Sequence, residues 1–285
     1  MKFRDLLASA IIAATLLAGG AATASPLIDF GGYTGPIQIK FQNYESFSTT
    51  PIGVGSMNFG VVKVTSIVNP NTGANVWVQG QAGQFLSGVF NGITVSSVTS
   101  TSGGFETTAT GGVFQFWLTS ADFDPGQGTS GYYCGVGGLC YNGIINAPGG
   151  SDVLNLDLVP GTTSGSPIAD SNTLSAFTSS LTLPASGHAE GFADIDAGNP
   201  GADASQFATG AFPTLFANAD FHLLDDFCTR GQSGCSGPTT SNWEFFSHDP
   251  VDAVIVPEPA SLGLLASALI GFGALGRRRR RTETT

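Results

Sequence analysis

Two short acidic segments contain side chains that could bind a hard cation. Asp122 and Asp124 stand at alternate positions before a Pro-Gly pair, and Asp194 and Asp196 stand at alternate positions before a Gly-Asn pair. Calcium prefers several oxygen ligands from a flexible loop, but neither segment matches the calcium-loop pattern with its distant Glu. Turn chemistry alone also explains Asp beside Gly or Pro. We therefore expect no cofactor, with Asp194 and Asp196 as the metal ligands if calcium does bind.

Side chains for acid–base or nucleophilic catalysis are few. His188 and Glu190 could form an acid–base pair on one face of a strand, although any exposed strand residues have this spacing. The segment 231–235 lacks the final Gly of a nucleophile elbow. The chain has neither a zinc-protease helix motif nor a phosphate-binding loop. We therefore predict that the protein is not an enzyme.

Alternation of apolar and polar residues predicts strands rather than helices. The chain has 40 Gly and 21 Phe but only 11% charged residues, whereas surface helices are usually rich in Lys, Glu and Arg. The pattern predicts an all-β fold, either an antiparallel β-sandwich or a barrel-like domain, with a loop at 160–171. The segments with the period of a half-buried strand, separated by turn residues, are 37–41, 61–65, 75–78, 113–118, 153–159 and 219–223.

The N-terminus has the three parts of a secretory signal peptide. Lys2 and Arg4 form a positive start, and an apolar run extends from Leu6 to Leu17. The small residues Ala22 and Ala24 then place cleavage by signal peptidase after Ala24. Residues 1–24 are therefore excluded from the predicted fold.

The C-terminus combines a rigid tripeptide, an apolar segment and a basic block. Pro257, Glu258 and Pro259 form a tripeptide that cannot lie inside a regular helix and holds the chain extended. Residues 260–276 carry no charge, which predicts a transmembrane helix at the short limit of about 17–25 residues. A buried core helix is the alternative, but core helices are usually amphipathic and this segment is apolar throughout. Five arginines that would stop translocation follow: Arg277, Arg278, Arg279, Arg280 and Arg281.

This C-terminal order resembles the sorting signal of PEP-CTERM proteins, which are exported bacterial proteins processed by the membrane transpeptidase exosortase. The resemblance covers roughly the last tenth of the chain and gives a signal peptide (1–24), an exported β-rich domain (25–255) and a sorting signal (256–285). It implies a Gram-negative bacterium and an intermediate tethered to the inner membrane. It also implies a product at the cell surface or in the extracellular exopolysaccharide matrix, with a structural or adhesive role in biofilm or flocculation.

Two other functions remain open for the exported domain. An extracellular polysaccharide-active enzyme could use two of the domain's carboxylates. A carbohydrate-binding module would need exposed aromatic faces, which Trp77, Trp117 and Trp243 could supply. Tryptophans buried in the β core would have no such role.

The exported domain is strongly acidic. Seven of the 10 Lys and Arg residues lie in the two terminal signals, and three of the 21 Asp and Glu residues do so. The remaining three basic and 18 acidic residues give a formal charge of −15. Such a surface repels nucleic acids, so we expect no nucleic-acid partner and interpret the charge as a source of solubility.

All four cysteines lie in the exported domain, where disulfides persist. Four cysteines allow three pairings. We expect Cys134 to pair with Cys140 and Cys228 with Cys235, each pair closing a Gly-rich loop. The cross-pairings remain open and would close longer loops. The spacings are longer than those typical of zinc sites.

Overall fold

The computed structural model describes residues 27–122, 150–163, 166–167, 172–214, 218–235 and 243–257. Several predictions from the sequence lie outside the described residues: the signal peptide, the apolar segment 260–276, Cys134 and Cys140, Asp124, Glu258 and Pro259, and the five arginines from Arg277 to Arg281. Among the residues that are described, no helix is long and apolar enough to cross a membrane.

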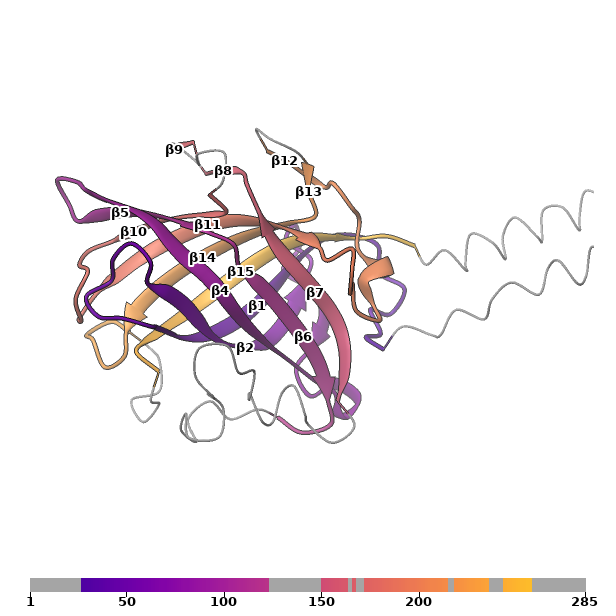
Figure 1. Ribbon diagram of the computed structural model, residues 1–285. Helices are drawn as coiled ribbons and strands as arrows, with labels where there is room; N and C mark the ends of the chain where they lie inside the picture. Colours follow the sequence, from indigo (N-terminus) through magenta and orange to yellow (C-terminus); the bar gives the residue numbers. More distant parts are fainter. Residues whose placement is uncertain are drawn as a thin grey trace, which may run out of the picture. The chain divides into compact units, whose positions relative to one another are not determined.

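The described part of the chain is built almost entirely from antiparallel strands (Figure 1). Two short 3-10 turns, η1 (Gln81–Gly83) and η4 (Ala204–Gln206), interrupt them. The strands are β1 (Gly35–Phe47), β2 (Met57–Val68), β3 (Asn75–Val78), β4 (Phe85–Ser100), β5 (Phe105–Thr110), β6 (Val113–Thr119), β7 (Ser151–Val159), β8 (Thr162–Thr163), β9 (Ser166–Pro167), β10 (Leu174–Thr178), β11 (Ser186–Ile195), β12 (Phe212–Pro213), β13 (Asn218–Ala219), β14 (Phe221–Thr229) and β15 (Phe245–Ile255).

The main sheet closes on itself as a barrel. Neighbouring strands hydrogen-bond in the order β1, β2, β4, β6, β7, β11, β14, β15 and back to β1. Closure removes the exposed sheet edges that would otherwise pair with other chains. The predicted all-β antiparallel fold is therefore confirmed, and of the two architectures expected the structure has the barrel.

The long strands β4 and β11 each change their hydrogen-bonding partner halfway along. The two halves of the barrel are therefore completed by different strands. The first part of β4 pairs with β6 and the second part with β5. In the same way β11 pairs with β7 near its end and with β10 near its start, and β5 pairs with β10. The change in β4 occurs around Gly92, whose φ of 77° is a conformation that glycine adopts without steric cost.

Alternate residues of each strand point into the barrel. One half of the interior is filled by large apolar side chains, and the rings of Phe90 and Phe114 stack with their centroids 5.2 Å apart. A separate apolar cluster includes Tyr44 of β1, Val61 of β2 and Trp117 of β6. Tyr44 and Val61 alternate with inward-pointing neighbours, so this cluster packs on the outer face of the wall.

Loops close both ends of the barrel. At one end the buried carboxylate of Asp203 accepts hydrogen bonds from the backbone N–H groups of Leu27 (2.8 Å) and Ile28 (2.7 Å). At the other end Ile52 N–H, in the β1–β2 loop, donates a 2.7 Å bond to the carbonyl of Leu181, in the β10–β11 loop. These backbone bonds hold loops from distant parts of the chain against the barrel.

Candidate functional site

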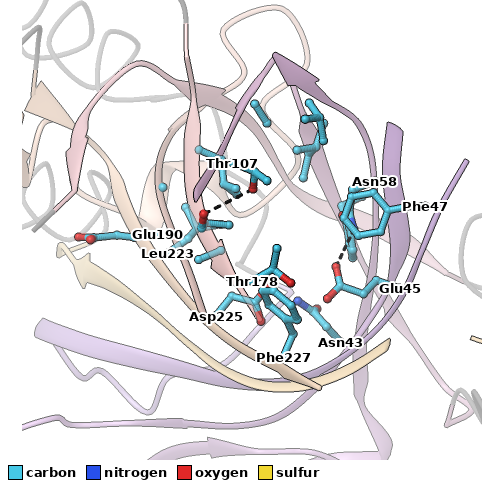
Figure 2. Close-up of a pocket in the computed structure, with 18 of the residues that line it drawn as sticks. Asn43, Glu45, Phe47, Asn58, Thr107, Thr178, Glu190, Leu223, Asp225 and Phe227 are labelled. Carbon is cyan, nitrogen blue, oxygen red and sulfur yellow. Dashed lines mark hydrogen bonds between the residues drawn. The ribbon is translucent and has the colours of Figure 1, made fainter. Parts of the chain in front are cut away.

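A cavity lies inside the barrel, in the half that β5 and β10 complete (Figure 2). Its volume is about 90 Å³, whereas a single water needs about 10–15 Å³. Most of its wall is apolar, and its aromatic side chains are Phe41, Phe47, Phe90, Phe114 and Phe227. The polar residues that line the cavity are Asn43, Glu45, Asn58, Thr107, Thr178, Glu190 and Asp225, and of these Glu190 points its side chain away from the cavity.

Strand alternation places the polar groups in the lumen. In β1 the buried residues Ile37, Ile39 and Phe41 are followed at the same spacing by Asn43 and Glu45. Glu45 pairs with Gly60 of the neighbouring strand β2. A Cβ atom at Gly60 would lie 2.7 Å from the ring of Phe90, so only glycine fits there beside that ring. The glycine therefore allows an aromatic side chain to pack close to the carboxyl group.

Glu45 is the most strongly perturbed acid of the described site. Its side chain is buried, with 6% of the residue exposed, and its Oε2 accepts a 2.9 Å hydrogen bond from Asn58 Nδ2. Burial and the nearby carboxylate of Asp225 raise the pKa of Glu45 to about 8, against the opposing effect of the Asn58 bond. At neutral pH Glu45 is therefore mostly protonated, and it can donate a hydrogen bond as well as accept one.

The cavity approaches solvent at the end where β1 and β14 meet the closing loops. Asp225 and Phe227 are only half-buried. Ile52 of the β1–β2 loop lines the cavity and packs in one apolar cluster with Val95, Ala185 and Phe245. The β1–β2 and β10–β11 loops, joined by the Ile52–Leu181 hydrogen bond, therefore lie at this end of the cavity.

Glu45 and Asp225 were not among the candidate residues predicted from the sequence. The signal that could have found them is a polar residue at an inward position of an otherwise apolar strand face. Asp225 follows Phe221 and Leu223 on β14 in this way, as Glu45 follows Phe41 on β1. A buried carboxyl group costs stability unless it is hydrogen-bonded or neutralised, so such positions are informative.

The outer face carries a second group of ionisable residues. His222 Nε2 lies 2.8 Å from Glu190 Oε1, and His222 Nδ1 lies 3.8 Å from Asp252 Oδ2. Asp252, and to a smaller extent Glu190, raise the pKa of His222 despite its burial, and His222 in turn lowers the pKa of Asp252. The ring of Phe192 stacks on His222 at 4.8 Å. Figure 2 shows the Glu190 side chain pointing away from the cavity.

The suggested acid–base pair of His188 and Glu190 is not what the structure shows. The two residues share one face of β11, but Glu190 contacts His222 while His188 stacks on Phe177 with ring centroids 5.6 Å apart. The partner of Glu190 comes from the neighbouring strand β14 because Phe192, two residues beyond Glu190, is directly opposite His222.

The acidic segments proposed as cation ligands bind the protein's own groups. Asp194 Oδ1 accepts a 3.1 Å bond from the Asp220 N–H, and Asp196 Oδ1 accepts a 2.7 Å bond from the Gly198 N–H. Burial and then the charge of Asp220 raise the pKa of Asp194. Asp122 forms an ion pair with Lys63 at 2.6 Å. In the part of the chain that the structure describes, no group of three or more His, Cys, Asp or Glu residues is arranged to hold a metal ion.

The remaining candidate residues have structural roles. Cys228 and Cys235 form a disulfide with Cα atoms 5.7 Å apart. Trp77, Trp117 and Trp243 are all buried, with 0%, 8% and 1% of each residue exposed. The tryptophans therefore offer no stacking face to a carbohydrate at the surface.

Comparison with known proteins identifies the end of the chain and not its barrel. Residues 256–281 match the family model of the PEP-CTERM protein-sorting motif. No curated protein and no solved structure matches the chain. The motif is the signal that exosortase recognises, which makes exosortase the processing partner. The chain therefore carries the PEP-CTERM sorting motif at residues 256–281, which indicates an exported protein that exosortase sorts through the membrane.

Proposed function

We propose that the barrel is the mature part of a non-catalytic protein of the Gram-negative cell surface or exopolysaccharide matrix, with a structural or adhesive role in biofilm or flocculation. The observation that carries this proposal is the position of the sorting motif. The motif begins at residue 256, and β15, which hydrogen-bonds to both β1 and β14, ends at Ile255. The sorting motif thus begins directly after the last strand of the barrel, so the barrel is the part of the protein that the motif would direct to the cell surface or matrix.

The positions of the perturbed carboxyl groups argue against the polysaccharide-active enzyme. A glycosidase needs two carboxyl groups on either side of a sugar that can reach them. Glu45, the described acid with the largest change in pKa, and its neighbour Asp225 face a cavity of about 90 Å³ inside the barrel. A cavity of this volume is too small for a polysaccharide chain.

The burial of the tryptophans argues against a surface carbohydrate-binding module. Stacking on sugars requires an accessible ring face, and the indole rings of Trp77 and Trp243 have almost no exposed surface. The proposed adhesive role therefore relies on the acidic surface of the domain and not on an aromatic platform. Divalent cations that bridge acidic groups would be one source of adhesion.

A comparison of three strains tests the proposed function. We would measure flocculation, and the amounts of barrel in the cell, matrix and medium fractions, for the wild type, a null strain and a strain lacking residues 277–281. Loss of flocculation in the null strain is the expected result. The truncated protein should leave the membrane fraction, because the basic block would no longer stop translocation.

Two assays separate the competing functions. Release of sugars from the host's own matrix by the purified protein would overturn the non-catalytic role. Specific binding on a glycan array would favour a carbohydrate-binding module. Unchanged flocculation in the null strain would refute the adhesive role.

A further inference from the structure

We propose that the barrel lumen binds a small organic ammonium ion, whose apolar body packs on the phenylalanine rings and whose positive charge lies beside Glu45 and Asp225. This assigns the cavity a ligand class and does not depend on the adhesive role proposed above.

The charge of the cavity wall selects for a cation. Three acidic residues, Glu45, Glu190 and Asp225, line the cavity, and the described lining residues include no Lys, Arg or His. The side chain of Glu190 points away from the cavity (Figure 2), so Glu45 and Asp225 are the acids beside a ligand. Charges interact more strongly inside a protein than in water because the effective dielectric constant is lower. An ammonium ion would be attracted to Asp225 and would stabilise the charged form of Glu45, whereas a carboxylate or phosphate ligand would be repelled by these acids.

The aromatic lining favours the same class of ligand. Phe47 and Phe227 stand at the loop-covered end of the cavity, and Phe90 lies deeper between the two halves of the barrel. The faces of such rings attract cations within about 6 Å, and cages of this type recognise quaternary ammonium groups. An apolar ammonium compound thus finds a favourable surface for both its charge and its carbon atoms.

Three polar residues around Glu45 already donate hydrogen bonds to protein acceptors. The carboxyl group of Glu45 is therefore the group to which a ligand cation would bind. Asn58 donates its amide hydrogen to Glu45 Oε2. Thr178 donates to the carbonyl of Ser180 at 2.8 Å, and Thr107 approaches the carbonyl of Ala176 at 3.4 Å. The hydroxyl groups therefore face backbone acceptors, and the strongest attraction for a ligand comes from the two acids.

Binding of an ammonium ion is linked to the proton on Glu45. In the absence of a ligand the pKa of this group is about 8, so at pH 7 most molecules carry the proton. A bound positive charge favours the carboxylate and lowers this pKa. Binding should therefore release part of a proton near neutral pH, and affinity should increase as pH rises toward 8.

Calorimetric titration of the purified full-length protein tests the proposal. The probes are choline, its neutral carbon isostere dimethylbutanol, and the anion trimethylacetate, each measured at pH 7 in phosphate and in Hepes. We expect choline to bind at least about tenfold more tightly than dimethylbutanol, as an ion pair with a buried carboxylate predicts. Trimethylacetate should not bind. The heat for choline should differ between the two buffers because a proton is released.

Matched variants locate the binding in the lumen. Glu45→Gln preserves the shape and the Asn58 contact but removes the charge, and it should weaken choline by about tenfold or more and abolish the buffer dependence. Glu106→Gln makes the same change at an exposed position of β5 and should leave binding unchanged. The proposal is overturned if dimethylbutanol binds as tightly as choline, if Glu45→Gln binds choline normally, or if none of the probes binds.

Discussion

Asn58 on β2 holds the carboxyl group of Glu45 on β1 inside the barrel through a 2.9 Å hydrogen bond from its Nδ2 to Oε2. The bond joins neighbouring strands, and both residues are buried. It favours the charged form of Glu45, but burial outweighs it and raises the pKa to about 8. The pair thus keeps an acid mostly neutral in a position where its full charge would be costly.

We predict that Glu45→Gln makes the barrel more stable at alkaline pH. The folded pKa of about 8 exceeds the ordinary value of 4.5, so between these values the unfolded chain loses a proton that the folded chain keeps. The contribution of Glu45 to stability is full below pH 4.5 and falls by about 1.4 kcal/mol per pH unit until pH 8. Glutamine does not titrate, so the variant should lack this decline.

Urea unfolding of the wild type and Glu45→Gln at pH 5, 6.5 and 8 measures the effect. The difference in free energy of unfolding should increase in favour of the variant at each step. Glu106→Gln, at an exposed position of β5, is the control and should run parallel to the wild type. If the difference in free energy of unfolding between Glu45→Gln and the wild type is the same at all three pH values, the folded pKa of Glu45 is not raised.

The sequence predicted strands where large apolar residues alternate with polar ones, as in β6 (Val113–Thr119) and β7 (Ser151–Val159). It did not reveal β11, because the inward positions Ala189, Gly191 and Ala193 are small. Large aromatic rings from other strands fill the lumen opposite these small residues. The sequence of β11 alone does not indicate this arrangement. The loop expected at 160–171 contains the short β8–β9 hairpin. Its strands have two residues each, which is too short for an alternating pattern to predict them.

Closure of the barrel and the ligand cavity could not be predicted from local patterns. Closure requires β1 to pair with β15, so that Gly35 meets Ile255 across the whole length of the domain. No local periodicity specifies a partner at that separation. The cavity likewise exists because strands distant in sequence bring Glu45, Thr107 and Asp225 to one interior space. The sequence contains these residues but does not indicate that they lie close together.

We predict that His222→Gln destabilises the fold more at low pH than at high pH. Asp252 and Glu190 raise the folded pKa of His222 above its ordinary value of 6.5. The stabilisation is therefore fully present below pH 6.5 and is lost as pH rises through the folded pKa. For this partly buried ion pair we expect a loss of about 1 kcal/mol at pH 5.5 that shrinks by pH 9.

Thermal or urea unfolding at the two pH values checks this prediction. His188→Gln makes the same substitution at an exposed position of neighbouring β11 and should have little effect at either pH. If His222→Gln costs the same at pH 5.5 and pH 9, the histidine contributes through its stacking on Phe192 and not through its charge.

We predict that replacing both Cys228 and Cys235 by serine lowers the free energy of unfolding by about 2.5 kcal/mol. The disulfide closes a loop with a sequence separation of 7 residues, and the chain-entropy estimate for so short a loop is of this size. Denaturant unfolding measures the loss. In a protein whose Cys134 and Cys140 have both been replaced by serine, dithiothreitol should destabilise the fold as much as the further replacement of Cys228 and Cys235 by serine does.

Peptide mapping of the exported protein under non-reducing conditions tests the second predicted pair, Cys134 with Cys140. A linked peptide that contains these two residues, and the absence of thiols that react with a maleimide, are the expected results. A peptide that joins Cys134 or Cys140 to Cys228 would contradict the connectivity in both halves of the prediction.

If calcium binds at Asp194 and Asp196, millimolar calcium should raise the melting temperature. Asp194 lies among other acids: its Cα pairs with that of Asp157 across the β7–β11 ladder, and Asp220 adds to the burial that raises its pKa. Asp196 has a similar effect on Asp157. A cation placed among these carboxylates would reduce their repulsion and stabilise the folded state, with a logarithmic dependence on its concentration relative to Kd.

The expected increase is about 3–5 °C when calcium is tenfold above its Kd. It should be smaller in Asp194→Asn/Asp196→Asn, whose own backbone turns can still form because asparagine keeps the acceptor oxygen that binds the Asp220 and Gly198 N–H groups. Magnesium should do less, since it dehydrates reluctantly and requires stricter geometry. Sodium at matched ionic strength separates a site from screening. If sodium raises the melting temperature as much as calcium, the −15 charge of the domain is simply screened, and Asp194 and Asp196 are turn residues without a metal.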